Sequence, residues 1–239
     1  ADSIFERFSF KNGEVSIDFT PDDEFMETYK KAGFKEPVIY YPRLLLVRFT
    51  ELYFRETGKE FTPTYFYSTK IPLIGSESEY PPEACEAYKK AIKLIVEHAK
   101  EAQWPEIILY LTDEPDLHVW QEWETAVSYK LAKEASPETK TFCTLYRPVL
   151  IEKYGKYIDY SSSRGLECAA PRQENKDMLA ACSKTGSRLW ASLWPRLWWH
   201  NYWYARAYAG FVCAKSGFEG QNIWQFSKLI SVENNGKYP

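Results

Sequence analysis

Two adjacent carboxylates, Asp113 and Glu114, follow an apolar run within residues 107–116, which read IILYLTDEPD. The run is apolar at successive positions, which predicts a strand that is covered on both faces. Pro115 has no backbone N–H and favours an extended conformation for Glu114 before it. Because successive strand residues point to opposite faces, both carboxylates can serve one ligand only if the strand ends here and the backbone turns.

Paired carboxyl groups point to glycoside hydrolysis, in which one is the general acid and the other the nucleophile or base. In common retaining barrels the acid follows the fourth strand and the nucleophile follows the seventh. The predicted seventh strand and its exit, residues 188–196 (RLWASLWPR), contain no Asp or Glu. A substrate-assisted route solves this, because the 2-acetamido oxygen of the sugar attacks the anomeric carbon. Asp113 would then orient and polarise the acetamide, and Glu114 would be the acid/base.

Three other interpretations of the pair are open. Asp113 or Asp116 can cap a following helix, but capping explains one carboxylate and not both. A second catalytic carboxylate can come from elsewhere, for instance Glu167 after the sixth strand. A metal site would use Asp113, Glu114, Asp116 and His118, and barrel hydrolase metal sites usually gather several histidines from different strands.

Histidines are scarce in this chain, which has three. His98 and His200 fall within predicted helices, and we expect His98 to be packed or to cap the end of its helix. We therefore expect no metal and no cofactor.

The elements that must position the pair alternate between short apolar runs and helical patterns, which is typical of βα units and a parallel sheet. Seven strands are predicted, at 15–19, 37–41, 105–114, 140–146, 159–163, 188–194 and 220–226. Helices are predicted at 20–33, 81–103, 118–136, 149–158, 172–186 and 199–217.

Helix ends and loops complete this prediction. Asn12-Gly13 is a hairpin turn signal, Thr20 is the predicted N-cap of the first helix, and Gly33 its stop. Residues of about 42–80 are read as an inserted loop with some structure of its own over the barrel mouth.

The expected fold is a single (β/α)8 TIM-type barrel domain over residues 1–239, lacking its first strand or opened there. Seven strands are one short of eight, so we expect the first to lie upstream of residue 1. On that count residues 105–114 form the fourth strand, and their end lies at the rim where barrel active sites form.

Composition limits the partners. The net charge of -3 and pI of about 5.8 argue against a nucleic-acid or anionic-membrane surface. No apolar run is long enough to span a bilayer, and the start does not resemble a secretion signal. The five cysteines include no CxxC pair, so buried free thiols are expected. Location and oligomeric state stay open.

Aromatic residues make up 17% of the chain, which suits a sugar site because pyranose faces stack on Trp and Tyr. Most tryptophans, including Trp190 and Trp203, are expected to pack in the core. Candidates for substrate binding lie at predicted strand ends: Tyr146, Tyr160, Trp194, Trp224 and Gln225, with Arg164 and Arg196 weaker.

Three segments resemble glycoside hydrolase family 123 and related barrel domains. They are residues 12–34 (NGEVSIDFTPDDEFMETYKKAGF), 110–115 (YLTDEP) and 206–226 (RAYAGFVCAKSGFEGQNIWQF). The resemblance implies a barrel that acts as a β-N-acetylgalactosaminidase through an Asp-Glu pair and substrate assistance. The family's first strand and additional β domain are not found in this chain.

The expected function is therefore a retaining exo-β-N-acetylhexosaminidase with a carbohydrate substrate, with Asp113 and Glu114 as the catalytic pair. Tyr146, at the end of the fifth strand, is a candidate donor to the acetamide carbonyl. The alternatives are a conventional two-carboxylate glycosidase and a non-catalytic carbohydrate-binding barrel.

Overall fold

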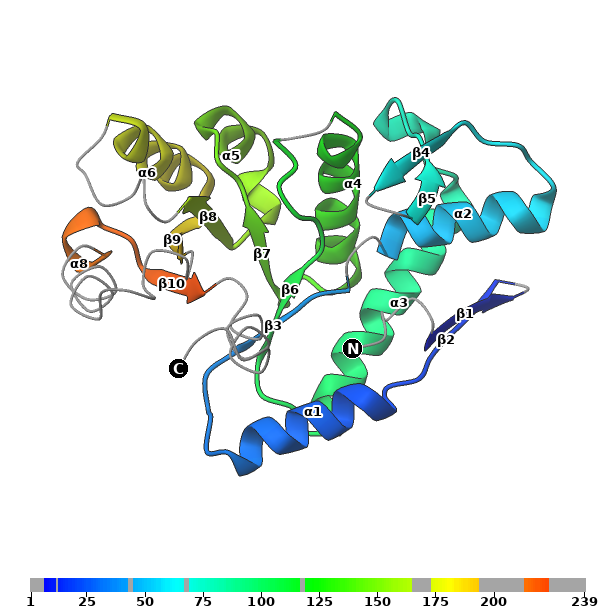
Figure 1. The fold of residues 1–239 in the computed structure, drawn as a ribbon, viewed down its shortest axis with the longest axis horizontal. Coiled ribbons are helices and arrows are strands. Elements are labelled where there is room, and N and C mark those ends of the chain that lie inside the picture. The colour runs from blue at the N-terminus through cyan, green and yellow to red at the C-terminus, as the bar shows by residue number, and fades with distance from the viewer. Residues whose placement is uncertain are drawn as a thin grey trace, which may run out of the picture. The chain divides into compact units, whose positions relative to one another are not determined.

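The protein is described here by a computed structural model covering residues 7–11, 13–42, 45–66, 69–116, 119–164, 173–193 and 213–223. The chain divides into two compact units, Ala1–Cys143 and Thr144–Pro239. It has an α/β fold, in which a parallel sheet alternates with helices (Figure 1). Each unit is described separately below.

The first unit opens with a β-hairpin. Strand β1 (Phe8–Lys11) pairs antiparallel with β2 (Glu14–Ile17) in a sheet of their own, and Gly13 in the turn has a φ of 77°. The prediction that residues 15–19 form a barrel strand is therefore wrong. Along β2 the side chains alternate between exposed and half-buried, so this strand lacks the cover on both faces that a barrel strand needs.

Helix α1 (Thr20–Lys31) begins differently from the prediction. The N-cap position is Phe19, so the prediction of Thr20 as the cap is wrong. The Thr20 N–H instead donates to the carboxylate of Asp18 at 3.0 Å. Gly33, with a φ of 87°, follows the end of the helix, and the predicted stop is confirmed.

Three parallel strands form the centre of the first unit: β3 (Val38–Tyr40), β6 (Ile107–Tyr110) and β7 (Lys140–Thr144). β6 lies between the other two. All four residues of β6 are buried, which confirms the prediction that both faces of this strand are covered.

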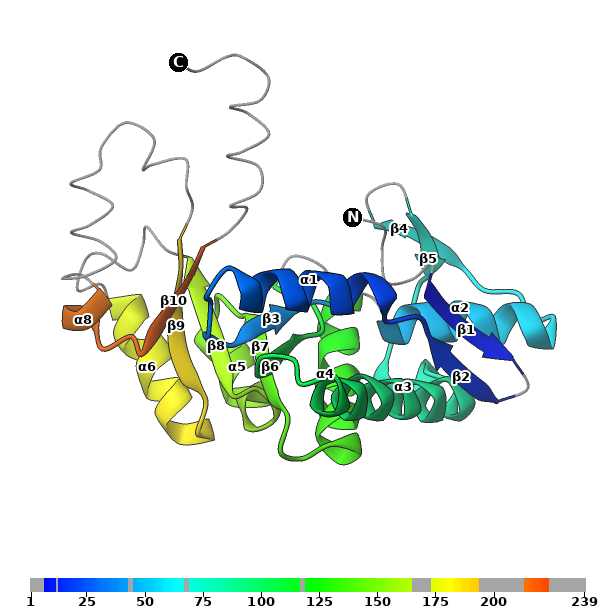
Figure 2. The same ribbon diagram turned by 90° about the horizontal axis from the view of Figure 1, so that it is seen from below.

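Two long helices cover these strands, α3 (Pro82–Glu101) and α4 (Val119–Ala135). They pack against each other (Figure 2). The spacing of Tyr88, Ile92, Ile95 and Ala99 at four and three residues predicts one apolar face of this helix, and all four are buried.

The segment of about 42–80 contains regular elements. Helix α2 (Leu45–Thr57) comes first, then the antiparallel pair β4 (Pro63–Phe66) and β5 (Thr69–Pro72), and then the 3-10 turn η2 (Glu77–Glu79). α2 packs on α3, so this segment adds to the core of the first unit.

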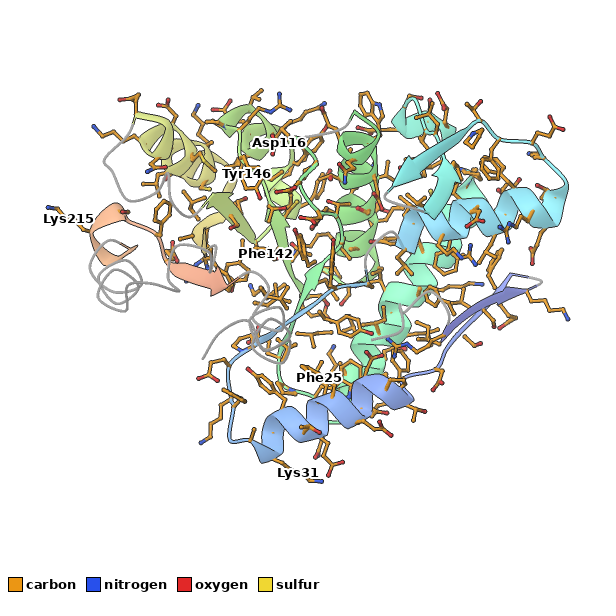
Figure 3. All side chains as sticks on the ribbon, in the orientation of Figure 1. Phe25, Lys31, Asp116, Phe142, Tyr146 and Lys215 are labelled. Atoms are coloured by element: carbon orange, nitrogen blue, oxygen red, sulfur yellow. The ribbon has the colours of Figure 1, made fainter. Side chains whose placement is uncertain are left out.

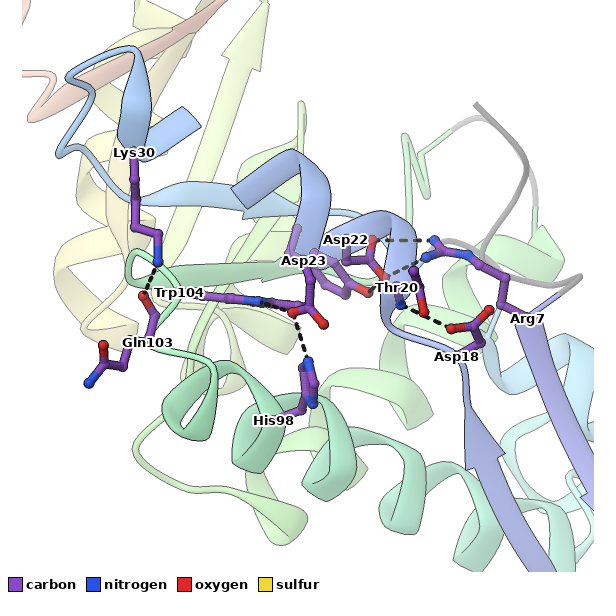
Figure 4. Close-up of polar contacts among 10 residues, drawn as sticks. Arg7, Asp18, Thr20, Asp22, Asp23, Lys30, His98, Gln103 and Trp104 are labelled. Atoms are coloured by element: carbon purple, nitrogen blue, oxygen red, sulfur yellow. Dashed lines mark hydrogen bonds and ion pairs between the residues drawn. The ribbon is translucent and has the colours of Figure 1, made fainter. Parts of the chain in front are cut away.

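A polar network attaches α1 to the end of α3 (Figure 4). One carboxylate oxygen of Asp23 lies 2.9 Å from His98 Nε2 and accepts a hydrogen bond of 2.7 Å from Trp104 Nε1. His98 also stacks on Phe19, with 4.0 Å between ring centroids. The prediction that His98 is a packed residue near its helix end is thus confirmed.

The second unit contains parallel strands β8 (Tyr160–Arg164), β9 (Arg188–Leu193) and β10 (Gly220–Ile223), with β9 in the middle. Its helical elements are α5 (Pro148–Tyr154), η3 (Gly155–Tyr157), α6 (Gln173–Thr185) and α8 (Cys213–Ser216). Trp190 packs on Tyr160 with 4.6 Å between ring centroids. A Cβ at Gly220 would lie 2.7 Å from the Trp190 indole, so this packing requires glycine.

Candidate functional site

The exit of β6 carries the two carboxylates, and its backbone turns there. The strand ends at Tyr110, Asp113 lies in a bend, and both carboxylates are half-buried. Glu114 has a φ of +46°, in the left-handed region. The predicted end of the strand and turn of the backbone are confirmed. The extended conformation expected for Glu114 is wrong, because the turn, and not Pro115, determines its backbone conformation.

Asp113 is held at its side chain and at its main chain. The Tyr110 hydroxyl donates a short hydrogen bond to the Asp113 carboxylate. The Gln121 side-chain amide of α4 donates to the Asp113 carbonyl oxygen at 2.9 Å. The first carboxylate therefore has a defined position relative to both β6 and α4.

Aromatic rings enclose Tyr110. Tyr41, just after β3, stacks on it with ring centroids 4.4 Å apart and an interplanar angle of 18°. Phe142 of β7 meets it edge-on, with centroids 5.0 Å apart. Figure 3 places Phe142 within β7 and Asp116 beyond the carboxyl end of β6. The ring of Tyr110, whose hydroxyl donates to Asp113, is therefore packed between the rings of Tyr41 and Phe142.

The hydroxyl of Tyr129, from α4, separates β6 from β7 where their pairing ends. It accepts the N–H groups of Leu111 at 3.2 Å and Thr112 at 3.4 Å, and donates to the carbonyl of Phe142. The last paired residues are Tyr110 and Phe142. Because this hydroxyl replaces ladder hydrogen bonds, the strand can end in a buried place without leaving its backbone groups unpaired.

Below the carboxylates lies a second buried polar contact. The Thr112 hydroxyl is 2.7 Å from that of Thr125 and 3.6 Å from Cys143 Sγ. Burial raises the pKa of the Cys143 thiol to about 12. The thiol is therefore protonated near neutral pH and is not an activated nucleophile.

Two of the other predicted site residues, Tyr146 and Tyr160, lie within the described ranges. Tyr146 is half-buried and follows the carboxyl end of β7 by two residues. Tyr160 is the first residue of β8, so it lies at the amino end of its strand, where barrel sites do not form. Trp194, Trp224 and Gln225 lie outside the described residues.

The residues of the remaining alternatives are placed in part. Over the described ranges, no three His, Cys, Asp or Glu side chains form a group that could hold a metal ion. His118, His200, Glu167 and Trp203 lie outside those ranges. No helix within the described part of the chain is both long and apolar enough to cross a membrane.

Sequence reasoning missed the residues that position Asp113, namely Tyr110, Gln121 and Tyr129. A partial signal existed: tyrosine is the one residue with a polar group in an otherwise aliphatic strand, and a buried tyrosine hydroxyl usually finds a partner. Gln121 and Tyr129 are eight residues apart, close to two turns of α4, which puts them on one face of the helix.

No protein-family model and no curated protein matches the chain. The function is therefore argued from the residues at the β6 exit.

Proposed function

We propose that this chain is a glycoside hydrolase, a retaining exo-β-N-acetylhexosaminidase of N-acetylgalactosaminide type that works by substrate assistance. The observation that carries the proposal is the arrangement at the β6 exit. There a strand buried on both faces ends in two half-buried adjacent carboxylates, and the first is held by a buried tyrosine. The sugar class is suggested by the resemblance of residues 110–115 to family 123.

In the proposed reaction the two carboxylates have different roles. Glu114 donates its proton to the glycosidic oxygen as that bond breaks, and the acetamide carbonyl oxygen of the substrate attacks the anomeric carbon. Asp113 accepts the acetamide N–H and stabilises the positive charge that develops on the cyclised ring. Glu114 then takes a proton from the water that opens the ring, and the anomeric configuration is retained.

The backbone at Glu114 supports this division of labour. Two successive residues on a regular strand point to opposite faces, whereas a left-handed residue reverses the chain direction locally. The φ of +46° at Glu114 is such a departure, and it comes immediately after Asp113. Strained backbone of this kind clusters at active sites, where surrounding structure holds it in place.

The remaining parts of the proposal concern fold and substrate binding. We propose that the parallel strands belong to a (β/α)8-type barrel, with the β6 exit at its working rim. Tyr146 is the proposed donor to the acetamide carbonyl from its sequence position after β7. Trp194, Trp224 and Gln225 stay candidates for sugar contact from their sequence positions.

The test uses nitrophenyl glycosides. We expect the chain to cleave the β-N-acetylgalactosaminide and to leave the plain β-galactoside intact, because only the first carries the internal nucleophile. Asp113→Asn and Glu114→Gln should each lower kcat about 10²–10⁴-fold. Glu24→Gln removes an exposed carboxylate from α1 and serves as the control.

Leaving groups separate the two roles. Glu114→Gln should lose most activity on substrates with poor leaving groups, since these need the acid, whereas Asp113→Asn should lose activity on all of them. A thiazoline that mimics the cyclised intermediate should bind far more tightly than the parent sugar. Cleavage of plain galactosides would instead indicate a conventional glycosidase, and sugar binding without cleavage a carbohydrate-binding barrel.

A further inference from the structure

We propose that Tyr110 is a positioning residue of the reaction: its hydroxyl donates to the Asp113 carboxylate and holds it in one orientation. This inference rests on the proposed function, and it adds a residue that the carboxylate pair alone does not include. It stands on three observations: the fixed ring of Tyr110, the direction of its hydrogen bond and the anchored main chain of Asp113.

The Tyr110 ring has little freedom to move. Its side chain is 5% exposed, packed between the face of Tyr41 and the edge of Phe142. Rotation of a ring enclosed in this way requires both neighbours to move. The hydroxyl therefore presents its proton at a fixed place, and the carboxylate oxygen that accepts it is fixed as well.

The direction of the hydrogen bond follows from ionisation. Burial, followed by the nearby charge of Asp113, raises the pKa of Tyr110 well above its ordinary value. Tyr110 is therefore a neutral phenol wherever a hydrolase works, and its O–H donates. A hydrogen bond donated to a carboxylate favours the ionised form. Substrate assistance needs that form at Asp113, because the acetamide N–H must have an acceptor.

The main chain of Asp113 is anchored separately, by Gln121 at 2.9 Å. With both ends fixed, the side chain turns little about its own bonds. The Tyr110 hydroxyl has a single proton, and it donates that proton to Asp113. The neighbouring carboxylates thus have different surroundings, which is how paired acids come to have separate roles.

Other ionisable groups near Asp113 do not change in the test. Glu114 and Asp116 lie on its own segment, Tyr41 follows β3, and Cys143 of β7 is a protonated buried thiol. α4 contributes the uncharged Gln121 amide and the phenol of Tyr129, whose pKa is raised by burial. A change in the titration of Asp113 on removal of the phenol oxygen is therefore attributable to Tyr110.

The experiment is Tyr110→Phe, which keeps the ring and both aromatic contacts. For the β-N-acetylgalactosaminide we expect kcat to fall about 10–100-fold with KM changing less than about threefold, because orientation in the transition state is lost. The acid limb of the pH–rate profile should move to higher pH, because the ionised carboxylate loses a donor. A merely structural role would not move that limb.

The control is Tyr88→Phe. Tyr88, on α3, is also buried in the first unit, and its hydroxyl lies near Ser128 of α4. We expect its kinetics and pH profile to match the wild type.

A readout without activity separates this inference from the proposed function. In carboxyl-labelled protein, the NMR signal of Asp113, identified by its loss in Asp113→Asn, should titrate at higher pH in Tyr110→Phe than in wild type. If that shift occurs in a protein that cleaves no sugar, Tyr110 positions Asp113 and the proposed function is wrong. If the signal titrates identically in both proteins, the role of Tyr110 is refuted whatever the activity.

Discussion

At the scale of single residues, the backbone of Glu114 is the least expected feature of the β6 exit. A residue before proline normally avoids helical conformations, and a glutamate rarely has a positive φ. The value here is +46°. Because Glu114 adopts a conformation that its own backbone disfavours, the surrounding structure must hold it there. The strained conformation costs about 1–3 kcal/mol.

Substitutions at Glu114 test this strain. We expect Glu114→Gly to be more stable than Glu114→Ala by about 1 kcal/mol, because glycine adopts a positive φ without a Cβ clash. Both variants lose the carboxylate, so they differ only at the backbone. Urea unfolding curves of the two give the comparison.

A position in an ordinary helix provides the control, because there alanine is more stabilising than glycine. At the half-buried Glu122 in α4, glycine should be less stable than alanine by about 1 kcal/mol. If the glycine variant were also less stable than the alanine variant at position 114, Glu114 would not be strained.

The missed contact between Tyr110 and Asp113 has a simple geometric reason. The two residues are three apart, and on a continuing strand such residues point to opposite faces. Their side chains meet because the strand ends at Tyr110 and the chain bends at Asp113. Residue types predicted the strand and its end, whereas the direction of the turn depends on Tyr129 and Gln121 from a separate helix.

At the scale of elements, the spacing of apolar residues predicts correctly those elements that bury one face or all of their residues. The apolar face of α3 and the fully buried β6 follow directly from the sequence. β2 was misassigned because its alternating pattern suits a hairpin strand as well as a barrel strand, and the pattern does not name the partner. The nearby Asn12-Gly13 turn signal was the better guide.

The attachment of α1 shows the same limit. The helix dipole favours an acidic first turn in α1, yet Asp23 also accepts a hydrogen bond from Trp104 and contacts His98 on another element. We expect Asp23→Ala to lower the free energy of unfolding by about 1 kcal/mol more than Glu24→Ala, because only Asp23 makes these bonds. Urea denaturation at pH 7 measures the difference.

Glu24 is a matched control, since it is the neighbouring exposed acid of α1 and its substitution removes the same charge. Equal effects of the two substitutions would mean that the contacts to Trp104 and His98 do not stabilise the attachment of α1.

At the scale of the whole molecule, buried phenols distinguish this fold from an ordinary apolar core. Burial is the leading cause that raises the pKa of the five tyrosines that lie buried within the described part of the first unit: Tyr40, Tyr80, Tyr88, Tyr110 and Tyr129. They come from β3, β6, α3, α4 and the loop before α3, so these buried phenols are spread over several elements of the first unit. Their ionisation is therefore linked to the folding of the unit.

The sign of this linkage gives a prediction for alkaline pH. Above about pH 10 the unfolded chain loses phenolic protons that the folded chain keeps. The free energy of unfolding therefore falls as pH rises above this value. Below it the five phenols contribute no pH dependence. Each contributes a slope of up to about 1.4 kcal/mol per pH unit.

After a jump to about pH 11.5, absorbance at 295 nm should rise first for exposed tyrosines and then in a slow phase. That phase should share the rate of unfolding seen by circular dichroism, and in urea-unfolded protein all eighteen tyrosines should ionise at once. Complete ionisation within the mixing time, with native circular dichroism retained, would refute the link between these phenols and the fold.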